Sequence, residues 1–537
     1  MNWKNANTYP YSSQRNVTFG RNGMVATSQP LAAQAGLDIL KKGGNAVDAA
    51  IAAAAALTVV EPTSNGIGSD AFALVWVKNK LYGLNASGHS PEGISLEALK
   101  ERGIKEIPKY GFTPVTVPGA PAAWAELAER FGNLPLKESL EPAVTYAREG
   151  FPLSPTLAGF WEKAARVFKE QLTGEEFQAW FETFAPGGKA PAAGEMWQSE
   201  DHAVSLEKIG ETSAESFYRG EIAEKIDQFS KDFGGFIRYK DLASFKPEWV
   251  DPISVNYKGY DVWEIPPNGQ GIVALMALNM LKNDSFTSRE AEDTYHRQIE
   301  AMKLAFTDGE KYITESGKMS QKTDDMLSDS YAQKRRNEIG EEALMPEAGD
   351  PSASGTVYLA AADNEGNMVS FIQSNYMGFG SGLVVPGTGI ALQNRGHNFS
   401  MDPEHDNVLA PKKRPYHTII PGFLTKGEEA VGPFGVMGGF MQPQGHMQVV
   451  MNSVDFGLNP QSALDAPRWQ WMGQKKVLVE QSVPNHIALS LTSRGHEIQM
   501  THQSGHFGRG QIIWRNPETG VLQGGTESRT DGSIAVY

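Results

Sequence analysis

Two strand-like runs on either side of a short polar loop most constrain the fold of this chain. The first run covers 355–362, the second covers 368–375, and both are rich in aliphatic and β-branched residues. The loop between them, 363–367, contains Asp, Asn and Gly, which is typical of a β-hairpin. A symmetric hairpin places Thr356 directly opposite Ser374, so the two hydroxyl groups lie close enough to hydrogen-bond.

Thr356 follows a glycine at the start of a predicted strand, and this pair alone would indicate an ordinary strand residue. It also meets the physical needs of a nucleophile released by a cut, a role that the family resemblance described below implies. A threonine hydroxyl is a weak nucleophile and needs an adjacent base. If the Gly355–Thr356 bond is cut, Thr356 acquires a free α-amine, which titrates at about 7.7 to 8.0 and can act as that base. Gly355 lets the precursor adopt the strained geometry in which the hydroxyl reaches the preceding carbonyl. The small residues of 349–355 are typical of a mobile, cleavable junction.

A second informative block lies near the N-terminus. Ser28 is expected to cap a helix over 30–42, and Asn45 is expected to cap a second, alanine-rich helix over 46–60. The glycine-containing segment 65–70 follows and leads into a predicted strand. Because its spacing is unlike that of a phosphate-binding loop, we interpret this segment as a turn.

These two blocks resemble the γ-glutamyltransferase family of N-terminal-nucleophile hydrolases. The sequence GGNAVDAA at 43–50 is similar to the start of the family's large subunit, and 355–398 is similar to the start of its small subunit. The resemblance extends over roughly 23–537. It implies an α+β fold, a four-layer αββα sandwich with a helix-rich large-subunit portion. The implied division is a large-subunit region, 1–355, and a small-subunit region, 356–537.

The resemblance assigns catalytic roles to four residues. Thr356 would be the nucleophile that self-cleavage after Gly355 releases, and Ser374 stands where the family has a threonine that hydrogen-bonds to it. The backbone N–H groups of Gly438 and Gly439 would form the oxyanion hole. Glycines suit this role because they let a carbonyl oxygen approach the backbone donors closely.

The positions that align with the family's substrate contacts carry different residues. Arg395 and Asn398 align with the glutamine and aspartate that hold the glutamyl α-amine. Loss of the acidic group and gain of Arg395 favour an anionic or neutral acyl group. The other aligned substrate-contact positions are Tyr376, His417 and Thr418. The large-subunit arginine that binds the carboxylate in the family has no clear match, and His89 lies in the corresponding region.

Three functions stay open at this stage. The first is hydrolysis or transfer of γ-glutamyl groups from glutathione-like amides through an acyl-threonine ester. The second is a cephalosporin acylase-like activity that removes a glutaryl group from an amide. The third is a non-catalytic relative that never cleaves itself.

Composition limits the partners and the compartment. The formal net charge of −15 argues against binding to a phosphate backbone. The chain has no cysteine, and its histidine spacing indicates no metal site, so we expect neither a metal nor another cofactor. We expect a cytoplasmic enzyme without membrane contact, because no signal peptide or membrane span is visible. The partners expected are a small-molecule amide, two fragments that stay associated after cleavage, and a homodimer of that processed heterodimer.

Overall fold

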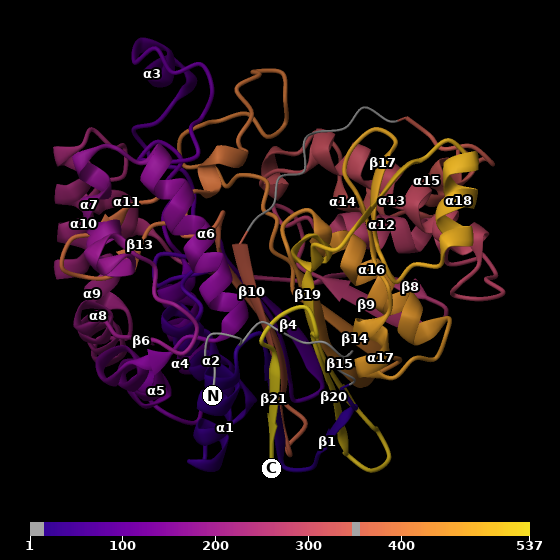
Figure 1. The fold of residues 1–537 in the computed structure, drawn as a ribbon, viewed down its shortest axis with the longest axis horizontal. Coiled ribbons are helices and arrows are strands. Elements are labelled where there is room, and N and C mark those ends of the chain that lie inside the picture. Colours follow the sequence, from indigo (N-terminus) through magenta and orange to yellow (C-terminus); the bar gives the residue numbers. More distant parts are fainter. Residues whose placement is uncertain (1–14, 346–354) are drawn as a thin grey trace.

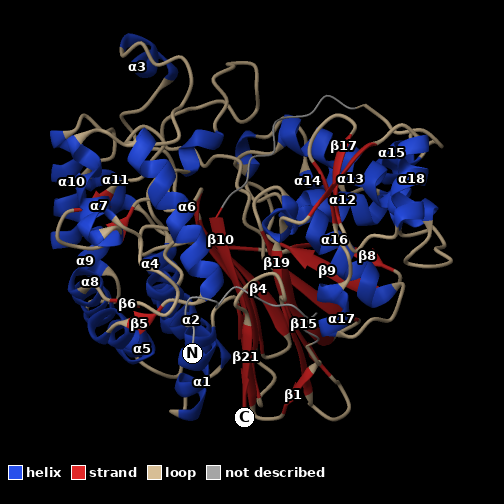
Figure 2. Ribbon diagram, viewed as in Figure 1, coloured by secondary structure: helices blue, strands red, loops and turns tan. Residues whose placement is uncertain are grey.

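The structure, a computed structural model, describes residues 15–345 and 355–537. The predicted junction at 349–354 lies outside these residues. Two seven-stranded antiparallel sheets stack at the centre, and helices cover the outer face of each sheet (Figure 1; Figure 2). The predicted four-layer αββα sandwich is therefore confirmed. No helix in the described part of the chain combines the length and the apolar content that a membrane span needs.

The first sheet contains the predicted hairpin. Its strands, in spatial order, are β21 (Ser533–Val536), β2 (Gly23–Thr27), β10 (Gly355–Asp363), β11 (Met368–Tyr376), β3 (Asp70–Val77), β4 (Lys80–Ala86) and β7 (Glu248–Val250). The second sheet has the order β1 (Thr18–Gly20), β20 (Leu522–Thr526), β19 (Arg509–Arg515), β15 (Glu429–Met437), β14 (Gly422–Lys426), β9 (Tyr260–Glu264) and β8 (Ile253–Tyr257). Smaller sheets are formed by β16 (Trp469–Trp471), β17 (Lys476–Glu480) and β18 (Glu497–Thr501), by β12 (Val384–Val385) and β13 (Ile390–Ala391), and by β5 (Phe151–Pro152) and β6 (Met196–Trp197).

The helices divide into two groups by sequence. The N-terminal group comprises α1 (Pro30–Lys41), α2 (Ala46–Val60), α3 (Leu96–Glu101), α4 (Ala120–Phe131), α5 (Leu136–Glu149), α6 (Pro155–Gln171), α7 (Gln178–Phe184), α8 (Glu200–Glu211), α9 (Glu215–Tyr218), α10 (Glu221–Asp232) and α11 (Tyr239–Ser244). It lies on the side of the first sheet, where α1, α2 and α4 pack on its strands. The other group comprises α12 (Gly271–Leu281), α13 (Glu292–Tyr312), α14 (Thr323–Met326), α15 (Asp329–Arg336), α16 (Met441–Val454), α17 (Pro460–Asp465) and α18 (Asn485–Ser493). It lies on the side of the second sheet, where α12, α16 and α17 pack on its strands.

The predicted N-terminal helices are present, with one correction to their caps. Asn45 caps α2, and its side chain accepts hydrogen bonds from the N–H groups of Val47 and Asp48. The cap of α1 is Gln29, whose side-chain oxygen accepts from two backbone N–H groups of the first turn. Ser28 instead donates its hydroxyl to the buried Glu61 carboxylate. The prediction of Ser28 as the cap was wrong because a buried carboxylate competes for its hydroxyl.

The hairpin has the predicted register over most of its length. Val357 pairs with Gln373, and Ala362 pairs with Met368. The register shifts between Gly355 and Val357, so the pairing is irregular at Thr356. Such a bulge frees one residue from regular pairing at the end of a strand.

Candidate active site

Three polar side chains lie in a row across the end of the first sheet. Val357 pairs with Gln373 next to the Thr356 position, and Ser374 pairs directly with Asp70 on the next strand. Neighbouring strands lie about 4.8 Å apart, so Thr356, Ser374 and Asp70 follow one another at that spacing. All three are fully buried. Phe72 on the same face of β3 belongs to the hydrophobic core between the two sheets, so the row faces the second sheet.

Ser374 connects the hydroxyl of Thr356 to the peptide bond before it. Thr356 Oγ1 donates to Ser374 Oγ at 3.0 Å, and Ser374 Oγ donates to the carbonyl oxygen of Gly355 at 2.7 Å. The Ser374 oxygen also accepts from the backbone N–H of Tyr376 at 2.8 Å. A side chain at residue 355 would begin 3.2 Å from the carbonyl oxygen of Thr63, so close packing favours glycine there. The hydroxyl pair is thus aimed at the Gly355–Thr356 bond.

Arg395 brings a buried positive charge to this row. Its Nη2 donates to Ser374 Oγ at 3.3 Å, and its Nη1 donates to Thr418 Oγ1 at 2.6 Å. The ring of Tyr376 lies 4.3 Å from the guanidinium carbon. Burial lowers the pKa of Arg395 to about 10, so the side chain stays charged at neutral pH. Within the described part of the chain Arg395 Nε is buried and has no hydrogen-bond partner.

Asn398 lies beside Tyr376, and both ends of its amide are engaged. Its Oδ1 accepts from the Tyr376 hydroxyl at 2.5 Å, and its Nδ2 donates to the carbonyl oxygen of Tyr416 at 3.1 Å. Tyr376 has a positive φ of 74°, which is uncommon for a residue with a side chain. The contact with Asn398 therefore helps to hold Tyr376 beneath Arg395.

Asp70 is a site residue that the sequence analysis interpreted only as part of a turn. Its Oδ2 accepts from His417 Nε2 at 2.9 Å, and its Oδ1 accepts from the backbone N–H of Gly88 at 3.1 Å. His417 Nδ1 accepts from the N–H of Ile419, which assigns the neutral tautomer with its proton on Nε2. Burial raises the pKa of Asp70 to about 7, against the lowering effect of the Arg395 charge. Burial also lowers the pKa of His417 well below its usual value.

Gly438 and Gly439 lie between the end of β15 and the start of α16. Both have positive φ, 136° and 61°, which favours glycine. Their carbonyl oxygens accept hydrogen bonds from the first N–H groups of the helix, those of Met441 and Gln442, each at 3.1 Å. A glycine pair at a helix N-terminus is suited to binding negative charge, because its backbone donors and the helix dipole both favour an anion.

His89 differs from the other predicted substrate contacts. It follows Gly88 in the chain, but its ring nitrogen contacts the carbonyl oxygen of Ser90 at 3.2 Å and its ring packs against Phe245. Thr418 and His417, by contrast, contact Arg395 and Asp70 directly. The structure therefore brings most of the predicted site residues together around Thr356 and Arg395. His89 and the glycine pair lie on separate segments.

One buried cluster has the side chains of a metal site. His296, Glu300 and His496 have ligand atoms within 4.8 Å of one another. However, Lys303 Nζ lies 2.8 Å from Glu300 Oε1, and His296 Nδ1 is hydrogen-bonded to His496 Nε2 at 2.9 Å. The lysine ammonium already supplies a positive charge to the carboxylate, so we assign no metal to this cluster.

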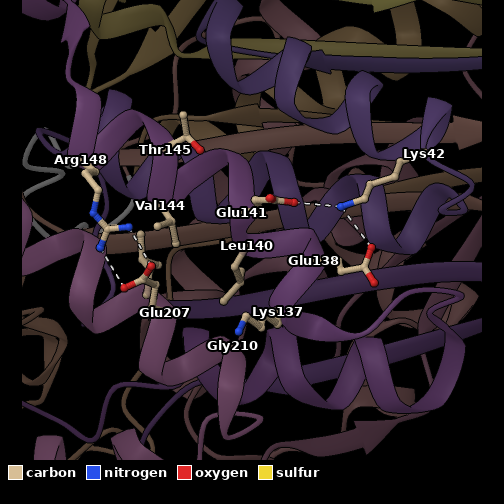
Figure 3. Close-up of a pocket in the computed structure, with 11 residues that line it drawn as sticks. Lys42, Lys137, Glu138, Leu140, Glu141, Val144, Thr145, Arg148, Glu207 and Gly210 are labelled. Atoms are coloured by element: carbon tan, nitrogen blue, oxygen red, sulfur yellow. Dashed lines mark hydrogen bonds and ion pairs between the residues drawn. The ribbon is translucent and has the colours of Figure 1, made fainter.

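A separate cavity of about 420 Å³ lies between α5 and α8. Figure 3 shows that charged pairs line it. Lys42 Nζ contacts Glu141 Oε2 at 2.9 Å, and Arg148 contacts Glu207 at 2.7 Å. Because these charges are paired with one another, we assign no ligand to this cavity.

Comparison with known proteins gives matches over almost the whole chain. The family model described as Gamma-glutamyltranspeptidase matches residues 32–537. The chain is 36% identical over 526 residues to the glutathione hydrolase-like YwrD proenzyme of Bacillus subtilis, covering 96% of this chain and 98% of that protein. It is 32% identical over 534 residues to the oxamate amidohydrolase proenzyme of Klebsiella pneumoniae, covering 96% and 98%. The crystal structure of a cephalosporin acylase from Bacillus halodurans is 64% identical, with a TM-score of 0.97 and coverage of 99% and 98%.

Proposed function

Because the chain belongs to the γ-glutamyltranspeptidase family, we propose that it is a hydrolase proenzyme that cuts itself between Gly355 and Thr356 and then removes acyl groups from amides. One observation carries this proposal. Ser374 accepts the hydrogen bond of the Thr356 hydroxyl and donates its own to the Gly355 carbonyl oxygen. The nucleophile and the bond to be cut are therefore joined through one side chain.

This geometry supports self-cleavage by the following steps. Thr356 Oγ1 attacks the carbonyl carbon of Gly355, a C–O bond forms, and the C–N bond between the two residues breaks. The hydroxyl proton is transferred to the leaving nitrogen, which becomes the α-amine of Thr356. The Ser374 hydroxyl stabilises the negative charge that develops on the Gly355 oxygen. Water then hydrolyses the ester, leaving a carboxylate on Gly355 and a free hydroxyl on Thr356.

The mature enzyme would use the same hydroxyl on its substrate. The α-amine of Thr356 accepts the hydroxyl proton as Oγ1 attacks the amide carbonyl, and it returns a proton to the departing amine. The N–H groups of Gly438 and Gly439 would donate to the oxyanion, in the manner of other acyl-transfer sites. Water or another amine then takes the acyl group from the ester, which gives hydrolysis or transfer.

The acyl group that this site fits best ends in a carboxylate, such as glutaryl. The buried guanidinium of Arg395 donates to Ser374, which in turn accepts from the Thr356 nucleophile, and among the described residues its Nε has no partner. Arginine binds carboxylates through paired, charge-assisted hydrogen bonds. The similarity to a cephalosporin acylase supports the removal of an acyl group from an amide of that kind.

A γ-glutamyl group is the second candidate, and Asp70 favours it. A γ-glutamyl group adds an α-ammonium to the distal carboxylate, and a buried ammonium needs an acceptor. Asp70 is a buried carboxylate near Arg395, and the two charges influence each other's pKa. The similarity to a glutathione hydrolase-like proenzyme supports this second candidate.

A panel of chromogenic anilides tests the proposal. We expect glutaryl anilide to exceed neutral butyryl anilide in kcat/KM by about tenfold or more, the value of a charge-assisted contact. Asp70→Asn separates the two candidates. It is expected to reduce γ-glutamyl turnover more than glutaryl turnover if Asp70 holds the ammonium. A wild-type protein that stays uncut and hydrolyses none of these anilides would refute the proposed function.

A further inference from the structure

Gln270 is a buried amide that connects two parts of the proposed site. It lies directly before α12 and is fully buried. Its Nε2 donates to the carbonyl oxygens of Thr418 at 2.6 Å and Gly439 at 2.8 Å. Its Oε1 accepts from the hydroxyl of Tyr416 at 2.8 Å. Both donors and the acceptor of this side chain are therefore used by residues in or beside the site.

The contact with Gly439 restrains a residue that has no side chain of its own. Gly439 has a φ of 61° and can rotate more freely than other residues. Its carbonyl oxygen accepts from Gln442 in the first turn of α16 and from Gln270, so two donors from separate elements fix its direction. A fixed carbonyl direction restricts the backbone of Gly439, and with it the direction of its N–H group.

The contact with Thr418 links the same amide to Arg395. Thr418 Oγ1 accepts from Arg395 Nη1 at 2.6 Å, while the Thr418 carbonyl oxygen accepts from Gln270. In addition, the backbone N–H of Gln270 donates to the carbonyl oxygen of His417 at 3.0 Å. Gln270 therefore holds two segments in a fixed relative position. One carries His417 and Thr418, and the other is the loop with Gly438 and Gly439.

We propose that Gln270 is a positioning residue for the oxyanion hole. It holds the Gly438–Gly439 loop at a fixed place relative to Arg395 and Thr418, so that the backbone donors meet the oxyanion when the acyl group is bound. This inference rests on the proposed function. Loss of the Gln270 hydrogen bonds weakens contacts made in the transition state more than contacts made by the bound substrate. As a result, kcat falls while KM changes little.

Gln270→Glu tests the proposal with little change in shape. The glutamate keeps an acceptor for Tyr416 but turns a double donor into an oxygen that faces two carbonyl oxygens. At about pH 8 we expect kcat for glutaryl anilide to fall at least about tenfold with KM within about threefold, as when one oxyanion-hole donor is weakened. Protonation of the buried carboxyl restores one donor, so kcat relative to wild type should recover as the pH is lowered towards about 6.

Gln448→Glu is the matched control. Gln448 is also a buried glutamine, on α16, and its Nε2 donates to the carbonyl oxygens of Gln444 at 3.1 Å and Trp469 at 3.0 Å. Those carbonyls belong to residues outside the proposed site. We expect this variant, once folded, to keep the wild-type kcat and to show no recovery at low pH.

Two results would overturn the role of Gln270. The first is a kcat within about twofold of wild type in Gln270→Glu, and the second is the same loss and the same recovery in Gln448→Glu. If Gln270→Glu does not fold, Gln270→Asn decides by the same criterion, because its shorter side chain withdraws the donor from Gly439. An uncut, inactive wild type would refute the proposed function, whereas an active wild type with unaffected Gln270 variants would refute only this inference.

Discussion

Replacement of Ser374 by alanine is the most direct test of how the site works. The hydroxyl of Ser374 donates to Gly355 and accepts from Thr356, Tyr376 and Arg395. Ser374→Ala removes one donor and one shared acceptor without changing the backbone. We expect it to slow both self-cleavage and the turnover of amides.

The magnitude follows from the groups that lose a partner. Without Ser374, the buried Gly355 oxygen loses the donor that opposes its developing charge, and the Thr356 hydroxyl loses its acceptor. A buried polar group left unsatisfied costs about 1 to 3 kcal/mol. If that cost appears in the barrier, the rate of self-cleavage falls by about 5- to 150-fold.

The assay follows the precursor directly. Precursor made by cell-free synthesis is sampled over time on a denaturing gel, and the fraction cut gives the rate of self-cleavage. Glutaryl anilide then measures turnover by the cut enzyme. Ser370→Ala is the control, since Ser370 lies on the same face of β11, is equally buried, and hydrogen-bonds to Tyr358 at 2.8 Å.

Two results would contradict this reasoning. If Ser374→Ala cuts itself and turns over amides at wild-type rates, the hydroxyl does not take part in either reaction. If Ser370→Ala shows an equal loss, the effect comes from the stability of the sheet. Ser374→Thr, which keeps the hydroxyl, is expected to retain both activities.

Three further predictions concern the cut, the anion contact and the buried carboxylate. Intact mass should show two fragments that meet between Gly355 and Thr356, with Thr356→Ala remaining a single chain; a cut Thr356→Ala would exclude that nucleophile. Arg395→Met should lower kcat/KM for glutaryl anilide by about tenfold to a hundredfold and leave butyryl anilide within about threefold; equal losses would assign Arg395 a structural role. Burial raises the pKa of Asp70 from 3.8 to about 7, so the folded state binds this proton more tightly than the unfolded chain does. The resulting contribution to the free energy of unfolding is fully present below pH 3.8 and is lost as the pH rises through about 7. Asp70→Asn should therefore gain stability relative to wild type in urea titrations as the pH rises over this range, and a constant difference would argue against a buried titration.

The hairpin and the helices were predictable because their determinants are local. The two strand runs and the Asp-Asn-Glu-Gly-Asn turn fix a register that brings Thr356 beside Ser374, and the 3.0 Å hydrogen bond between their hydroxyls agrees with it. The Asn45 cap is likewise local, since its acceptors and donors lie within three residues.

The residues that complete the site were not predictable in this way. Asp70 and His417 are 347 positions apart, and only the stacking of the two sheets brings them together. The aspartate at the start of a strand was the one indication in the sequence that 65–70 is more than a turn. Asn398 was predicted as a substrate contact from its alignment alone, but in the structure both ends of its amide are hydrogen-bonded to tyrosines. Such competition for a polar group depends on tertiary contacts.

The order of strands in the first sheet has a consequence for refolding if the chain is cut as proposed. Strand β2 from the N-terminal region lies between β21 and β10, which both come from the C-terminal region. The sheet can therefore assemble from one continuous chain, but after the cut its strands belong to two molecules. Renaturation of the cut form then becomes a second-order process that slows on dilution, whereas the uncut precursor refolds at a rate independent of its concentration. Complete unfolding of the cut form at low concentration would therefore be slower to reverse than unfolding of the precursor.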